Sequence, residues 1–151
     1  MSTLEAGLTA AHAEVKAEIA RTDTKTSLLL AFIGAVLAGV WTAAKDVPLP
    51  VAASVAGGLG VLLLVAAAGL LLRAVRPRIS GAPVAGFPLW ATLTADEIRA
   101  RLAHDERGQD IVNLSRIAIA KYRTLRRAVD LVCAGGMLLI TAAAFTIGGA
   151  A

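Results

Sequence analysis

The stretch from Ala20 to Ala44, ARTDTKTSLLLAFIGAVLAGVWTAA, decides the fold of this chain. It opens as a charged, threonine-rich run and continues as an uncharged apolar run, with no proline and no glycine before Gly34. Because no helix breaker interrupts the change, the sequence predicts one helix that leaves water and enters hydrocarbon. An acid, Asp23, and a base, Lys25, stand at the point of entry.

Three apolar blocks dominate the composition, in which 57% of residues are hydrophobic and 17% are charged. A soluble domain carries about 25% charged residues, so the excess favours membrane spans over a large core. The blocks run from Thr26 to Ala44, from Val47 to Leu72 and from Leu131 to Ala151, and none of them contains a charge. About 20 apolar residues are enough for one helix to cross a bilayer. The expected fold is therefore all-α and integral to the membrane, with three transmembrane helices.

The distribution of cations predicts the orientation of these spans. Most lysines and arginines lie between Arg73 and Arg127, and the turn between the first two spans holds only Lys45. The positive-inside rule then places the N-terminus and residues 73–127 in the cytoplasm. Four acids in the first 25 residues argue against a cleaved signal peptide.

The expected organisation is a cytoplasmic helix over 1–25, a two-span hairpin over 26–72, a cytoplasmic segment over 73–127 and a third span over 128–151. The cytoplasmic segment is expected to hold a short helix after a capping box at Thr94–Glu97 and a long helix that starts near residues 105–110. A Gly/Pro-broken stretch precedes the box, and its apolar residues are expected either to rest against the headgroups or to dock between helices: Phe87, Leu89 and Trp90.

Apolar residues at steps of three and four mark a seam on each of the two long helices. The first seam comprises Leu4, Leu8, Ala11, Val15 and Thr22, and Ile19 stands slightly off it. The second comprises Ile111, Leu114, Ala118, Tyr122, Leu125, Val129 and Val132. Facing each other, the two seams would form a cytoplasmic helical stalk that continues the first and last spans, either within one subunit or between subunits.

Two groups of residues are candidate functional sites. Small residues in the spans allow close helix packing, within the chain or in self-association: Gly34, Ala38, Gly57, Gly60, Ala144 and Gly148. The charges at the join form either a hydrated boundary or a juxtamembrane latch between the long helices. In a latch, Asp23 would pair with Lys121, Arg126 or Arg127, and the candidate set also includes Lys25 and Tyr122.

The sequence offers no catalytic constellation. The two histidines, His12 and His104, lie far apart along the chain, and the one cysteine, Cys133, falls in the third span. No phosphate-binding glycine loop, zinc-type cysteine pair or nucleophile elbow is present. Scarce aromatic residues and membrane-proximal cations also speak against nucleic-acid binding. The expectation is a protein that is not an enzyme and has no cofactor.

Several short motifs, in order along nearly the whole chain, resemble a known family. They are RTDTKTSLLLAFIGAVLAG with Asp23 and Lys25, LLLRAVRPRI after the second span, GFPLW, and IVNLSRIAIAKYRTLRRAVDL before the last span. The pattern resembles the Pycsar effector membrane module, the PycTM-like family. In this chain its last motif corresponds to Ser115, Ile117, Lys121, Tyr122 and Leu125.

The resemblance implies a multi-pass protein of the bacterial inner membrane that acts in antiphage defence. Such a module would form homo-oligomers and impair the membrane downstream of a cyclic-nucleotide signal. The 151 residues leave no room for a separate nucleotide-binding domain, so either the cytoplasmic helices or a sensor protein would receive the signal. The alternative is a non-toxic anchor or adaptor for a cytoplasmic partner.

Overall fold

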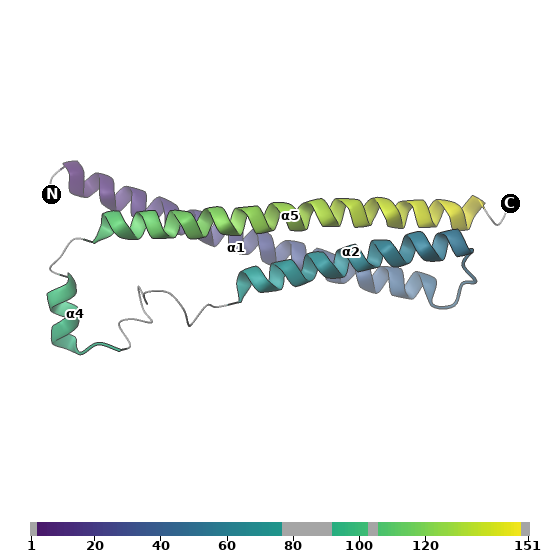
Figure 1. Ribbon diagram of the computed structural model, residues 1–151, viewed down its shortest axis with the longest axis horizontal. Helices are drawn as coiled ribbons and strands as arrows, with labels where there is room; N and C mark the ends of the chain where they lie inside the picture. The colour runs from purple at the N-terminus through teal and green to yellow at the C-terminus, as the bar shows by residue number, and fades with distance from the viewer. Residues whose placement is uncertain (1–2, 77–91, 103–105, 149–151) are drawn as a thin grey trace.

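The computed structural model describes residues 3–76, 92–102 and 106–148. Over these residues it is helical, with α1 at Thr3–Ala44, α2 at Val51–Val75, α4 at Ala95–Leu102 and α5 at Arg107–Gly148. Helices α1 and α5 run in the same direction, while α2 returns between their C-terminal halves (Figure 1). Each of α1, α2 and α5 is long and apolar enough to cross a membrane, which confirms the expected fold class. The stretch with Phe87, Leu89 and Trp90 lies outside the described residues.

Helix α1 is continuous through residues 20–44, where the charged run changes to the apolar run. Its hydroxyl groups bond inside the helix, where Thr22 Oγ1 donates to the Glu18 carbonyl and Thr26 Oγ1 donates to the Thr22 carbonyl. Thr24 and Ser27 make the same bond to the carbonyl four residues earlier. Because the hydroxyl donors are satisfied locally, the helix can approach the bilayer without leaving unpaired polar groups.

The tightest helix contact joins α2 to α5 at two glycines. A Cβ placed on Gly60 would lie 2.9 Å from the carbonyl oxygen of Gly135, and a Cβ on Gly135 would lie 2.9 Å from that of Gly60. Only glycine lets the two backbones approach this closely. The adjoining core contains the buried residues Ile33, Leu64, Ala67, Leu71 and Ala128. These contacts fix how far α2 slides along α5.

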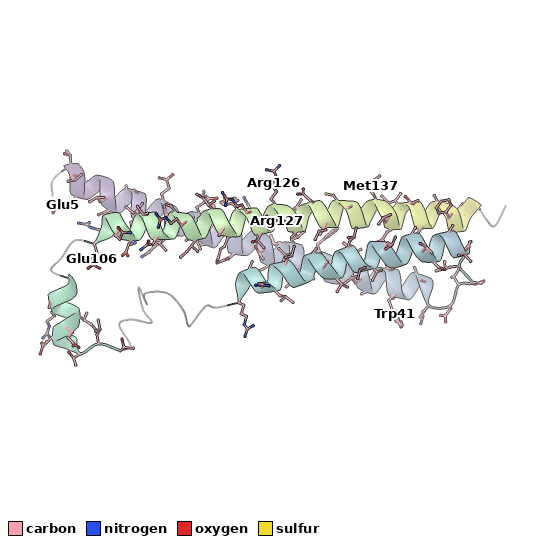
Figure 2. The ribbon with its side chains drawn as sticks, viewed as in Figure 1. Glu5, Trp41, Glu106, Arg126, Arg127 and Met137 are labelled. Atoms are coloured by element: carbon pink, nitrogen blue, oxygen red, sulfur yellow. The ribbon has the colours of Figure 1, made fainter. Side chains whose placement is uncertain are left out.

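The three long helices change from apolar to charged at one level. Leu71 near the end of α2 belongs to the same buried cluster as Ala128 of α5, so Arg73 lies near the charged part of α5. On α1 this level falls a few residues after Lys25, because Asp23 contacts Lys121. Basic residues thus ring the helices at one depth, as the headgroup layer of a bilayer favours. At the other end, Trp41 is 73% exposed, which suits an interfacial anchor (Figure 2).

The charged N-terminal halves of α1 and α5, residues 3–25 and 107–127, lie against each other and are called the stalk here. On α1, Leu8, Ala11 and Val15 are half-buried and Thr22 is buried, as the first seam predicts; Ile19, which stands slightly off the seam, is half-buried as well. Leu4 was wrongly expected to share that contact and is 71% exposed. The reason is that α5 begins at Arg107, level with Thr9, so none of the described helices stands opposite the first turn of α1.

The second seam is correct at Ile111, Leu114, Ala118 and Leu125, which are buried or half-buried. It is wrong at Tyr122 and Val129, whose exposed fractions are 39% and 41%. Ala128 is fully buried instead, because α2 joins the contact from that side of α5. Because α1 and α2 pack on adjoining faces of α5, the buried position is Ala128 rather than Val129.

The short helix α4 begins with the predicted capping box. The backbone N–H and the hydroxyl of Thr94 each donate to Glu97 Oε2 at 2.8 Å, and the N–H of Glu97 lies 3.4 Å from Thr94 Oγ1. These bonds, the backbone one first, lower the pKa of Glu97 below its ordinary value. The predicted box is confirmed.

The capping box gives a pH dependence confined to the start of α4. Because the pKa of Glu97 is lowered in the folded chain, the stabilisation is present above the unfolded pKa and is lost as pH falls through the folded one. We expect the Thr94 amide proton shift, followed by NMR in micelles, to titrate with a midpoint below that of an ordinary glutamate. Glu97→Gln should abolish the titration, whereas a midpoint at the ordinary value would contradict the cap.

Candidate functional site

The candidate site is the junction between the stalk and the spans, where α1 and α5 exchange polar contacts. Lys121 Nζ lies 2.5 Å from Asp23 Oδ1. The lysine side chain is 23% exposed and the aspartate side chain 45%. A partly desolvated ion pair is less screened by salt than a surface pair. Of the three cations that the sequence offered as partners of Asp23, the structure brings Lys121 to it.

A second cross-helix contact involves the residue of α5 that follows Lys121 and a residue of α1 nearer the start of the stalk. The Tyr122 hydroxyl donates to Glu18 Oε1. The Glu18 carboxylate also pairs with the Arg21 guanidinium of its own helix at 3.1 Å. It therefore bonds to one side chain of α1 and to one of α5. Between the two cross-helix contacts, Thr22 is 2% exposed and Ala118 is 9% exposed. Small side chains at this crossing let the ion pair and the tyrosine reach across.

The other members of the predicted latch do not enter the junction. Lys25, Arg126 and Arg127 are exposed, and among the described residues no salt bridge reaches any of them. Figure 2 shows Arg126 projecting away from the neighbouring helices. Their depth and exposure suit contact with anionic headgroups. Sequence position alone placed all three close to Asp23 but did not give the face of the helix.

The predicted small-residue positions divide into two groups. Gly60 meets Gly135, and a Cβ placed on Gly57 would lie 3.6 Å from the Cβ of Ala142. Gly34, Ala38, Ala144 and Gly148 are exposed, so within the described part of the chain they do not lie in a buried helix contact. Gly135 was not among the predicted packing positions. The adjacent small residues Gly135 and Gly136 in the third span nevertheless indicate close helix packing, as the glycines of the second span do.

The contacts of the junction hold α1 and α5 together in one register. Among the described residues no group of three His, Cys, Asp or Glu side chains could hold a metal ion. His104 lies outside the described residues. The junction instead fixes the height of α1 against α5, because Asp23–Lys121 and Thr9–Arg107 join residues with the same separation of 98 positions along the chain. Arg107 Nη1 donates to Thr9 Oγ1 at 2.7 Å, so the same register holds near the far end of the stalk.

Comparison with known proteins identifies the family. No curated protein and no solved structure matches the chain. The model of the PycTM family, described as a Pycsar effector protein domain, matches residues 7–148. That range includes the junction and the greater part of α1 and α5, together with α2 and α4. Since the match covers nearly the whole chain, the protein belongs to the PycTM family of Pycsar effector domains.

Proposed function

We propose that this multi-pass membrane protein is an antiphage-defence effector that self-associates in the bacterial inner membrane and impairs its barrier. In this proposal the N-terminus and residues 73–127 face the cytoplasm, in accordance with the positions of the cations. A cyclic-nucleotide signal reaches the stalk, either directly or through a sensor protein. The chain acts without catalysis, cofactor or nucleic acid, and the lipid bilayer is its target.

One observation carries the proposal: α1 and α5 are each continuous for 42 residues from the stalk into a span. A helix is stiff over this length, so a rotation or separation of the stalk moves both spans. The junction lies where such a movement would pass from water to lipid. The exposed small residues of the spans, such as Gly34 and Ala38, leave surface for contacts between copies.

The proposal predicts that expression of the chain depolarises bacteria, in the presence of a cyclic nucleotide if a signal is needed. We expect a loss of the potential-sensitive dye signal and entry of a membrane-impermeant dye within minutes of activation. Lys121→Met keeps the apolar stem but removes the charge that meets Asp23, and should abolish most of the depolarisation. The matched control is Lys25→Met, which removes an exposed cation of α1 near the same level. This variant should retain the depolarisation.

The alternative function, a non-toxic anchor, gives the opposite result. Normal growth and full membrane potential in every cyclic nucleotide tested, with the chain recovered from the membrane fraction, would refute the effector proposal. Equal activity of the Lys121→Met and Lys25→Met variants would keep the effector but remove the junction from its mechanism.

A further inference from the structure

A second row of side chains on α5 is largely exposed, and its member Tyr122, which donates to Glu18, lies at the edge nearest α1. The row steps by three and four, and we call it the outer α5 row: Val112, Ser115, Ile119, Tyr122, Arg126, Val129, Cys133, Gly136 and Ile140. Its large apolar members stand open, with exposed fractions of 42% for Val112, 52% for Ile119 and 65% for Ile140. Arg126 is its one charged member. Seven-residue periodicity over this length is the pattern of a helix that packs along a partner helix.

Helix α1 carries a complementary row of small side chains. This outer α1 row comprises Ala6, Ala10, Ala13, Ala17, Ala20, Thr24, Leu28, Ala31, Ala35, Ala38 and Thr42. Every member is exposed, and none carries a charge. Leu28 is the only large side chain in it. Like the outer α5 row, it begins in the stalk and continues along a span.

The two rows have matching layers at matching heights. Two stalk contacts, Thr9–Arg107 and Asp23–Lys121, join residues 98 positions apart, so we take each α5 residue as level with the α1 residue of that lower number. Ala31 is thus level with Val129, Ala35 with Cys133 and Thr42 with Ile140. Leu28, the one large residue of the outer α1 row, also lies level with Arg126, the one charged residue of the outer α5 row. Copies inserted in the same orientation therefore present both rows at the same depth.

Charge selects which row meets which. The stalk half of α5, residues 107–127, holds six cations and one carboxylate. The stalk half of α1, residues 3–25, holds three cations and four carboxylates. Pairing two α5 helices would set Arg116 and Arg123, which flank the row, against their own copies. Pairing α5 with α1 places the strongly basic stalk half against the mildly acidic one, which is the favourable combination.

The occupant must also cross from water into lipid, because both rows do. A soluble protein would cover only the stalk part. A second copy of this chain supplies a helix of the right length, direction, depth and charge.

We infer that the outer α5 row of one copy packs in parallel along the outer α1 row of the next copy. Such a contact joins two different surfaces, so repetition gives a ring or an open chain of subunits rather than a closed dimer. The small α1 row lets the large α5 side chains insert between its residues. This inference rests on the self-association in the proposed function and names the surfaces that carry it.

The native thiol provides a direct test, since Cys133 lies in the outer α5 row level with Ala35. In isolated membranes treated with copper phenanthroline, Ala35→Cys is expected to give a disulfide-linked ladder of dimers, trimers and larger species. The wild-type chain, with Cys133 alone, and Ala35→Cys/Cys133→Ala should both remain monomeric on a denaturing gel. Gly34→Cys is the matched control, exposed one residue away and about 100° around the helix. It should crosslink at least several-fold less.

A second pair in the stalk keeps the test independent of any one variant. In a Cys133→Ala background, differently tagged chains that carry Ala17→Cys or Ser115→Cys should form mixed dimers when coexpressed and none when expressed singly. Dimers of one variant alone, or a ladder from Gly34→Cys equal to that from Ala35→Cys, would overturn the inference. Crosslinking and depolarisation are read separately. A ladder without depolarisation keeps the interface and refutes the barrier lesion, whereas depolarisation without a ladder does the reverse.

Discussion

Replacing Gly135 by leucine is expected to separate α2 from α5 and to abolish the folded arrangement of the spans. A Cβ at this position would lie 2.9 Å from the Gly60 carbonyl oxygen, 3.3 Å from Leu64 Cγ and 3.4 Å from Leu63 Cβ. The first of these is backbone, which cannot rotate away as the end of a flexible side chain can. The further atoms of leucine would have to enter the same contact.

The expected loss is large by the standards of single substitutions. Overpacking a well-packed contact costs about 1–3 kcal/mol and occasionally more. Gly135→Ala should lie in that range, and Gly135→Leu should exceed it. The measurement is the unfolded fraction in mixed micelles of increasing SDS content, followed by circular dichroism and by protection of cysteines placed at the α2–α5 contact.

Neighbouring glycines provide the matched controls. A Cβ at Gly136 or at Gly58 would meet no atom within 4 Å, so alanine there should be neutral or slightly stabilising through higher helix propensity. Equal destabilisation by Gly135→Ala and Gly136→Ala would show that the backbones do not cross at Gly60. Gly60→Ala should reproduce the effect of Gly135→Ala, and the double variant should be less than additive because both changes open one contact.

The sequence was informative about this fold where a local pattern determines the outcome. The absence of glycine and proline between Gly7 and Gly34 predicts a continuous α1, and Thr94 with Glu97 predicts the start of α4. The level of the membrane boundary follows from the positions of the last charges. Each of these conclusions needs only one segment and the physics of water against lipid.

The contacts between helices were harder to predict because they depend on the relative height of two segments. Every span is rich in small residues, so composition could not single out Gly60 and Gly135 from Gly34 or Gly148. Leu4 fits the first seam but stands beyond the end of α5, which a helical period cannot reveal. The position of α2 beside α5 decides that Ala128 is buried and Val129 is not.

The ion pair of Asp23 with Lys121 was only partly predictable from the sequence. The sequence identified Asp23 as a carboxylate in need of a partner and placed three cations at a similar depth. Choosing Lys121 required the rotation of α5, which its packing against both α1 and α2 sets. The sequence placed Tyr122 both in the apolar seam and in the candidate latch, but it did not identify Glu18 as the partner of the tyrosine hydroxyl.

Exchanging the charges of Asp23 and Lys121 is expected to restore what either single change removes. Asp23→Lys places two cations at the junction and Lys121→Asp places two carboxylates there, so each should loosen the pairing of α1 with α5. The combined variant again brings opposite charges together. The lysine side chain is 23% exposed, so leaving it unpaired carries part of the cost of a buried charge.

The magnitude follows from the exposure of the pair. With 45% of the aspartate side chain open to solvent, screening reduces the interaction toward the surface range, and a coupling of about 1 kcal/mol is expected from a double-mutant cycle with Asp23→Asn and Lys121→Gln. Raising the salt concentration should shrink this coupling, because mobile ions screen a partly exposed pair. The readout is the crosslinking yield between cysteines at Thr9 and Gly108, which reports stalk pairing. A cycle with Lys25→Gln in place of Lys121→Gln should show no coupling to Asp23, since residues two apart on a helix diverge. Additive effects of Asp23→Asn and Lys121→Gln would instead show that the stalk is held by its apolar contacts and that the charges act only with solvent or lipid.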